Sequence, residues 1–75
     1  MKPTIGRIVI YQVSENDPPE IRNNHAKFLP AIVVASWSDT CANLKILTDG
    51  PVDGWKTSVV HGYAPGQWQW PTREE

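Results

Sequence analysis

The alternation of apolar and polar residues divides this chain into short strands. Residues 6–13 (GRIVIYQV) are rich in β-branched and aromatic side chains, which favours a strand. The alternation gives this predicted first strand two faces, one with Ile8 and Ile10 and the other with Arg7, Val9 and Tyr11.

Four further strands are predicted downstream. Residues 30–37 (PAIVVASW) and 42–48 (ANLKILT) form a hairpin, with SDTC as its turn. The strongest turn signal is DGPVDG at 49–54, and residues 55–60 (WKTSVV) return from it as another strand. A last short strand, QWQW, ends at Pro71.

Residues 14–28 carry two adjacent prolines, several charges and the polar run NNH, without helical periodicity. They predict a long surface loop, a feature that is often functional in a compact domain. Residues 72–75 (TREE) predict a flexible tail.

Five strands without a helix or an internal repeat predict an all-β fold. With 75 residues, the chain is expected to form a single domain over residues 1–75. We expect a small five-stranded antiparallel meander that curls into an SH3-like barrel or a strongly bent sheet.

The expected strand register divides the sheet into a core face and a second face. We expect Trp37 opposite Ala42, and Thr48 opposite Trp55. The predicted core face contains Ala31, Val33, Ala35, Trp37, Leu44, Ile46, Trp55, Thr57 and Val59. The predicted second face contains Ile32, Val34, Ser36, Asn43, Lys45, Leu47, Lys56, Ser58 and Val60. Its apolar strip predicts a homo-oligomer, a dimer or tetramer.

Composition excludes several classes of protein. A formal net charge of -1 argues against a binder of DNA or RNA polymers, which needs a surplus of Lys and Arg. Cys41 is the single cysteine, and with only two histidines there is no zinc-binding spacing, so we expect neither disulfide, metal nor other cofactor. No apolar run is long enough to cross a membrane, which predicts a cytoplasmic protein.

The tryptophans indicate a binding protein more strongly than an enzyme. All four, Trp37, Trp55, Trp68 and Trp70, lie in the second half of a small chain with little interior to bury them. Trp68 and Trp70 lie two apart, so both rings project to one side, where they could stack on a flat base. Alternatively, they close the barrel or cover a dimer contact.

Two sets of polar residues could contact phosphate. Lys56, Thr57 and Ser58 offer an ammonium and two hydroxyls, although these residue types are ordinary in strands. Arg7 and Tyr11 place a guanidinium beside an aromatic ring, which suits a phosphate next to a base, unless Arg7 pairs with a surface carboxylate.

No catalytic pattern is present in the sequence. His25 with Asp17 and Glu20, or His61 with Cys41, lacks the setting of a nucleophile elbow, a glycine-rich phosphate loop or paired carboxylates. We therefore expect a protein that is not an enzyme.

Several motifs carry a resemblance to a known family. The runs IGRIVIY, PAIVVASWSDTCANLKILTDGP, WKTSV and PGQWQWP resemble a family of very small tailed-phage proteins, over nearly the whole chain outside residues 14–28. That family resembles the phage anti-CBASS sponges, which capture cyclic dinucleotide immune signals without cleaving them. The resemblance implies an immune-evasion protein acting in the host cytoplasm. The alternative is a structural or adaptor subunit of a phage particle.

Overall fold

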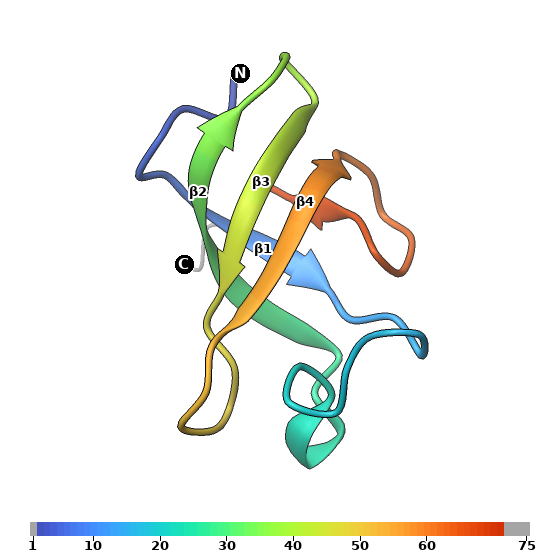
Figure 1. Cartoon of the computed structure of the whole chain (residues 1–75). Helices are drawn as coiled ribbons and strands as arrows, with labels where there is room; N and C mark the ends of the chain where they lie inside the picture. Colours follow the sequence, from blue (N-terminus) through green and yellow to red (C-terminus); the bar gives the residue numbers. More distant parts are fainter. Residues whose placement is uncertain (1, 72–75) are drawn as a thin grey trace, which may run out of the picture.

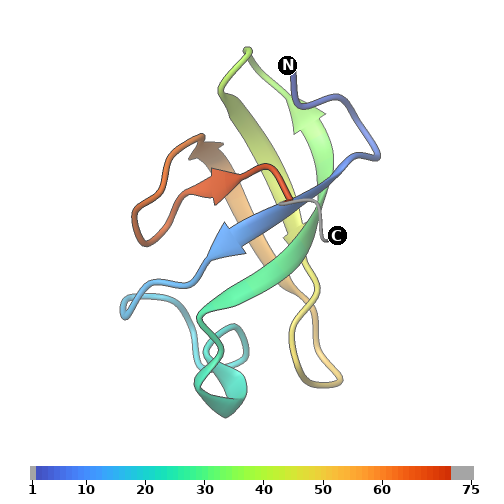
Figure 2. The ribbon, with the colours of Figure 1, turned by 180° about the vertical axis from the view of Figure 1, so that it is seen from behind.

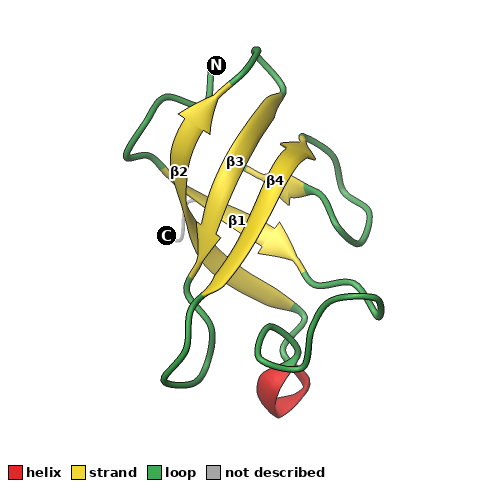
Figure 3. Cartoon of the chain, viewed as in Figure 1, coloured by secondary structure: helices red, strands yellow, loops and turns green. Residues whose placement is uncertain are grey.

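The protein is built on five antiparallel strands with almost no helix, in a computed structural model that describes residues 2–71. The elements are β1 (Ile8–Gln12), the 3-10 turn η1 (Asn23–His25), β2 (Phe28–Ser36), β3 (Cys41–Ile46), β4 (Gly54–Val60) and β5 (Trp68–Gln69) (Figure 1 and Figure 3). The predicted all-β class is confirmed. The predicted flexible tail, 72–75, lies outside the described residues.

The strands form one strongly bent sheet in the order β4-β3-β2-β1-β5. The first four strands form a meander, and β5 returns to pair with β1. β2 is long enough to pair with β1 through its first half and with β3 through its second. β1 and β5 therefore cross behind β3 and β4 (Figure 1), and the reverse view shows β5 beside β1 (Figure 2). A bulge bends β2 between Val33 and Ala35.

The inner face of this bent sheet carries the core. Apolar residues that alternate along the strands are buried there, and burial of each large one stabilises the fold by about 1.5–3 kcal/mol. The buried apolar side chains in the strands are Val9, Tyr11, Leu29, Ala31, Val33, Ala42, Leu44, Ile46, Val59 and Trp68. Of the two predicted faces of the first strand, the one with Val9 and Tyr11 is thus the core face.

The predicted register of both hairpins is wrong. Ala42 pairs with Ser36 and not with Trp37, because the turn closes earlier than predicted, with Trp37 N–H donating to the Cys41 carbonyl at 2.9 Å. The β2 bulge, which leaves Val34 without a partner, then shifts the register again. Trp55 pairs with Lys45 and not with Thr48, because the turn before β4 is longer than DGPVDG alone. A shift by one residue moves a side chain to the other face of a sheet.

The register shift corrects the predicted core. Trp37 and Trp55 are 63% and 50% exposed, Thr57 is exposed, and Ala35 is half-buried. Lys56 instead pairs with Leu44, which places it on the core side of β4. Five predicted core residues are buried as expected, namely Ala31, Val33, Leu44, Ile46 and Val59.

The 14–28 segment is not wholly a surface loop. Asp17 and Ile21 are buried in it, η1 forms within it, and Phe28 already belongs to β2. Ile21 packs against the backbone of Gly54, where an added Cβ would lie 2.6 Å from Ile21 Cγ1. Glycine at the start of β4 therefore allows the segment to pack onto the sheet.

Substitution of Gly54 tests this packing. Because the added methyl group would overlap a buried side chain, Gly54→Ala should lower the free energy of unfolding by about 1–3 kcal/mol in urea denaturation. Gly50→Ala is the matched control, since its Cβ would overlap the end of the Asn23 side chain, whose hydrogen bond to the Asp49 carbonyl is exposed, and no core residue. Equal losses for the two variants would contradict the assigned role of Gly54.

Candidate ligand-binding site

Four aromatic rings form a continuous row at the end of β4. The rings of Trp68 and Trp70 are 5.1 Å apart and nearly perpendicular. His61 lies 4.8 Å from Trp68, and Tyr63 lies 5.5 Å from His61, both with edge-to-face geometry. Edge-to-face packing is favourable because the positive edge of one ring meets the negative face of the next.

Trp68 fixes this row to the sheet. Its indole is fully buried, and its N–H is shared between the carbonyl oxygens of Val59 at 3.1 Å and Thr40 at 3.2 Å. The backbone adds a second connection, because Gly62 N–H donates to the Trp68 carbonyl at 2.9 Å. The short strand β5 is thereby held against the end of β4 as well as against β1.

A surface hollow of about 340 Å³ opens beside the row. Two exposed or half-buried rings, Tyr63 and Trp70, line it together with His61, and the β2–β3 turn contributes Asp39 and Thr40. Tyr63 is 73% exposed, so one of its ring faces is available to a ligand. The hollow is therefore mainly aromatic with a few polar groups, as small-molecule sites commonly are.

Two nitrogen-bearing groups lie in or beside the hollow. His61 Nε2 is buried and has no hydrogen-bond partner among the described residues. An unpaired buried polar atom costs about 1–3 kcal/mol. Arg7 places its guanidinium carbon 5.2 Å from the Trp70 ring centroid, a cation–π distance.

The structure separates the residues predicted to contact a ligand. Arg7 and Trp70 lie together, as a pair beside the hollow. Tyr11 and Trp68 are both 0% exposed, so neither has a ring face to offer a ligand, and the prediction that they stack on a base is wrong. They belong to the core because their strand positions face inward.

The three residues of β4 that were predicted to contact phosphate lie in different surroundings. Lys56 forms an ion pair with Asp17 at 3.0 Å. Thr57 and Ser58 are exposed on β4, at the opposite edge of the sheet order from β5. Ser58 has a positive φ of 53°, and its N–H donates to Asn43 Oδ1 at 2.8 Å in the irregular part of the β3–β4 ladder. None of these three residues lines the hollow of Tyr63 and Trp70.

Sequence reasoning missed most of the hollow's lining. Asp39, Thr40 and Tyr63 were not candidates, and His61 was considered only beside Cys41. The available signal was the position of HGY directly after a strand and before PGQW, which places two rings near the last strand. The turn residues Asp39 and Thr40 carry no comparable signal, because only the bend of the sheet brings them close.

Asp17 lies at the centre of a buried polar network. Its carboxylate accepts hydrogen bonds from Tyr11 Oη at 2.8 Å and from the Ser14 N–H at 2.8 Å, and it pairs with Lys56. Burial by itself raises the pKa of Asp17, but these hydrogen bonds and the Lys56 charge outweigh it and hold the pKa below its ordinary value. Burial, followed by the contact with this carboxylate, raises the pKa of the Tyr11 hydroxyl.

Within residues 2–71, no group of three or more His, Cys, Asp or Glu side chains is placed to hold a metal ion. The same part of the chain contains no helix long and apolar enough to span a membrane. Comparison with family models, with curated proteins and with solved structures found no match to this chain.

Asp17→Asn should lower the free energy of unfolding at pH 7 by about 1.5–3 kcal/mol, because charge-assisted hydrogen bonds are lost inside the fold. A carboxyl group with a lowered pKa stabilises the folded state above its unfolded pKa of about 3.9. This contribution disappears as the pH falls through the lower folded pKa. In urea denaturation, the difference between wild type and variant should therefore shrink below about pH 4.

Asp53→Asn is the matched control for this prediction, since Asp53 is exposed. It should be as stable as wild type at neutral pH. A difference between wild type and Asp17→Asn that stays constant from pH 7 to acid would show that the carboxylate charge is not the stabilising feature.

Proposed function

We propose that the protein binds a cyclic dinucleotide at the aromatic hollow and sequesters it without cleavage. The observation that carries the proposal is the wall of the hollow, where the exposed ring of Tyr63 and the half-buried ring of Trp70 lie with His61. In this proposal, which also draws on the motif resemblance, the protein is a phage immune-evasion factor of the host cytoplasm.

Each group at the hollow has a role in this proposal. Tyr63 and Trp70 stack on a base, a contact worth about 1–3 kcal/mol per base. His61 packs edge-to-face against Tyr63 and supports that ring at the hollow, and Arg7 contributes positive charge for a phosphate. Together these groups supply the flat surface and the charge that a nucleotide requires.

The size of the hollow points to a shared site. About 340 Å³ lies near the lower end of the range of about 300–1,000 Å³ for small-molecule pockets, so it suits one nucleotide unit. A cyclic dinucleotide has two such units related by near two-fold symmetry. Two copies of the protein, each holding one unit, would match that symmetry.

A second copy has a candidate contact on the outer face of the sheet. Ile8 pairs with Ile32, Ile32 with Lys45, and Lys45 with Trp55, so these four side chains form one row across four strands. Val34, Trp37 and Val60 are also exposed there. In a two-fold contact, Lys45 of one copy can lie on Trp55 of its partner, a favourable cation–π arrangement.

Ligand binding should depend on Tyr63 and Arg7. Titration calorimetry with a panel of cyclic dinucleotides should show a complex with wild type, and Tyr63→Ala and Arg7→Gln should each weaken it by about tenfold to a hundredfold. Phe28→Ala and Lys2→Gln remove an exposed ring and an exposed cation elsewhere, and neither should change the affinity. Chromatography of the released ligand should recover it intact.

Several outcomes would contradict this function. If wild type binds no member of the panel, the protein does not have this function, and a structural or adaptor role in a phage particle is favoured. If Tyr63→Ala and Arg7→Gln bind as wild type does, the hollow is not the site. If protein-dependent hydrolysis products appear, the protein is an enzyme and not a sponge.

The oligomer is tested separately at the outer face. Wild type should sediment as a dimer or tetramer, and Val34→Glu should reduce the mass to the 8.4 kDa of one chain, because a carboxylate would be buried at the contact. Val52→Glu is the matched control, since Val52 is exposed in the turn before β4. An 8.4 kDa wild type at micromolar concentration would exclude the proposed contact.

A further inference from the structure

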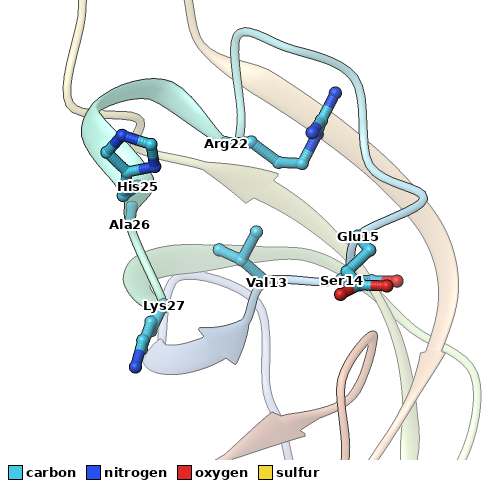
Figure 4. A pocket seen from close by; sticks show the side chains of 7 residues that line it. All are labelled: Val13, Ser14, Glu15, Arg22, His25, Ala26 and Lys27. Carbon is cyan, nitrogen blue, oxygen red and sulfur yellow. The ribbon is translucent and has the colours of Figure 1, made fainter.

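The direction of the lining side chains distinguishes two hollows of this protein. A hollow of about 370 Å³ in the 14–28 segment is lined by charged side chains, but Arg22 and Lys27 point away from each other on opposite sides of Val13 (Figure 4). Their charges do not converge on one ligand. At the aromatic hollow, the exposed ring of Tyr63 comes from the β4–β5 loop, residues 61–67 (Figure 1). The position of this ring therefore depends on how that loop is held.

The end of the β4–β5 loop is fixed to β1 by backbone hydrogen bonds. Gln12 N–H donates to the Gln67 carbonyl at 2.9 Å, and Gly66 N–H donates to the Gln12 carbonyl at 2.8 Å. Gln67 N–H in turn donates to the Ala64 carbonyl at 3.1 Å, which closes a four-residue turn through Pro65 and Gly66. Gly66 has a φ of 85°, as at the third position of a type II turn. The Gln67 side chain thus starts from a fixed backbone.

That side chain crosses the middle of the loop. Gln67 Oε1 accepts the Ala64 N–H at 3.1 Å. On its other side the amide lies against Gly62, where an added Cβ would overlap the same oxygen. Gly62 N–H is itself bonded to the Trp68 carbonyl at 2.9 Å. The two residues that flank Tyr63 in sequence are therefore both held, one by the Gln67 amide and the other by β5.

The Tyr63 ring is supported as well. Its edge-to-face contact with His61 has 5.5 Å between the ring centroids, and His61 packs in the same way on the buried ring of Trp68. Gln67 does not line the hollow, so its amide acts there only through the backbone beside Tyr63. A ring that is ordered before binding lowers the entropic cost of forming a complex.

We propose that Gln67 is a positioning residue of the aromatic hollow, which holds Tyr63 ready to stack on a base through its hydrogen bond with the Ala64 N–H. This inference rests on the proposed function and adds to it a residue that sets the affinity without touching the ligand. Methionine has a side chain of similar length but no oxygen, so Gln67→Met fills the loop without making the hydrogen bond. The variant therefore separates the hydrogen bond from the filling of space.

Nitrogen-15 relaxation of the full chain without ligand tests the position of Tyr63. The backbone order parameters of Tyr63 and Ala64 should be about 0.85 in wild type, as in rigid backbone, and should fall to about 0.6 or lower in Gln67→Met. Gln67→Glu keeps an oxygen acceptor and should restore the wild-type values. Gly62→Ala, whose methyl group would displace the Gln67 amide, should lower the order parameters as Gln67→Met does.

Titration calorimetry measures the consequence for binding. With a cyclic dinucleotide that wild type binds, Gln67→Met should weaken the affinity by about fivefold to thirtyfold, because binding must then order the loop. Gln69→Met is the matched control, since Gln69 is a half-buried glutamine of β5 that does not line the hollow. It should bind as wild type does.

Two results would overturn the positioning role. One is that Tyr63 and Ala64 have the same order parameters in wild type and in Gln67→Met. The other is that wild type and Gln67→Met bind the dinucleotide equally well, which would leave the proposed function intact. If wild type itself binds no cyclic dinucleotide, the proposed function fails and the role of Gln67 in binding fails with it.

Discussion

The buried indole of Trp68 is the contact on which the closed end of this small sheet depends. Its N–H bonds to carbonyl oxygens of both the β2–β3 turn and β4, while its own strand pairs with β1. One side chain thus joins the two ends of the strand order. Without it, β5 would be a two-residue strand with few contacts, and the rings of His61 and Trp70 would lose the surface on which they pack.

Asp17 performs the corresponding task at the other end of the molecule. A chain of this length has little core with which to order a long loop, because folding one residue costs about 1–2 kcal/mol of backbone entropy. Asp17 offsets part of that cost through hydrogen bonds to Tyr11 and Ser14 and an ion pair with Lys56. Trp68 and Asp17 are thus each a buried residue whose polar group bonds to more than one part of the chain.

The two errors in the predicted faces have one physical origin. Alternation identifies which residues belong to one face of a strand, but it does not fix how neighbouring strands align. One bulged residue in β2 was sufficient to expose Trp37. A turn between β3 and β4 that is longer than the DGPVDG motif was sufficient to expose Trp55. The same shift turned Lys56 inward, where it found the carboxylate of Asp17.

The sequence by itself determined the all-β class, the approximate strands and which side chains of β1 share a face, because these depend on residue type and local period. It also singled out Arg7 and Trp70. Only the tertiary structure decided that Tyr11 and Trp68 are core residues, and that Asp39, Thr40, His61 and Tyr63 share a hollow with Trp70. These groups come from strands and turns far apart in the chain, and their meeting depends on the bend of the sheet, which no local pattern of residues encodes.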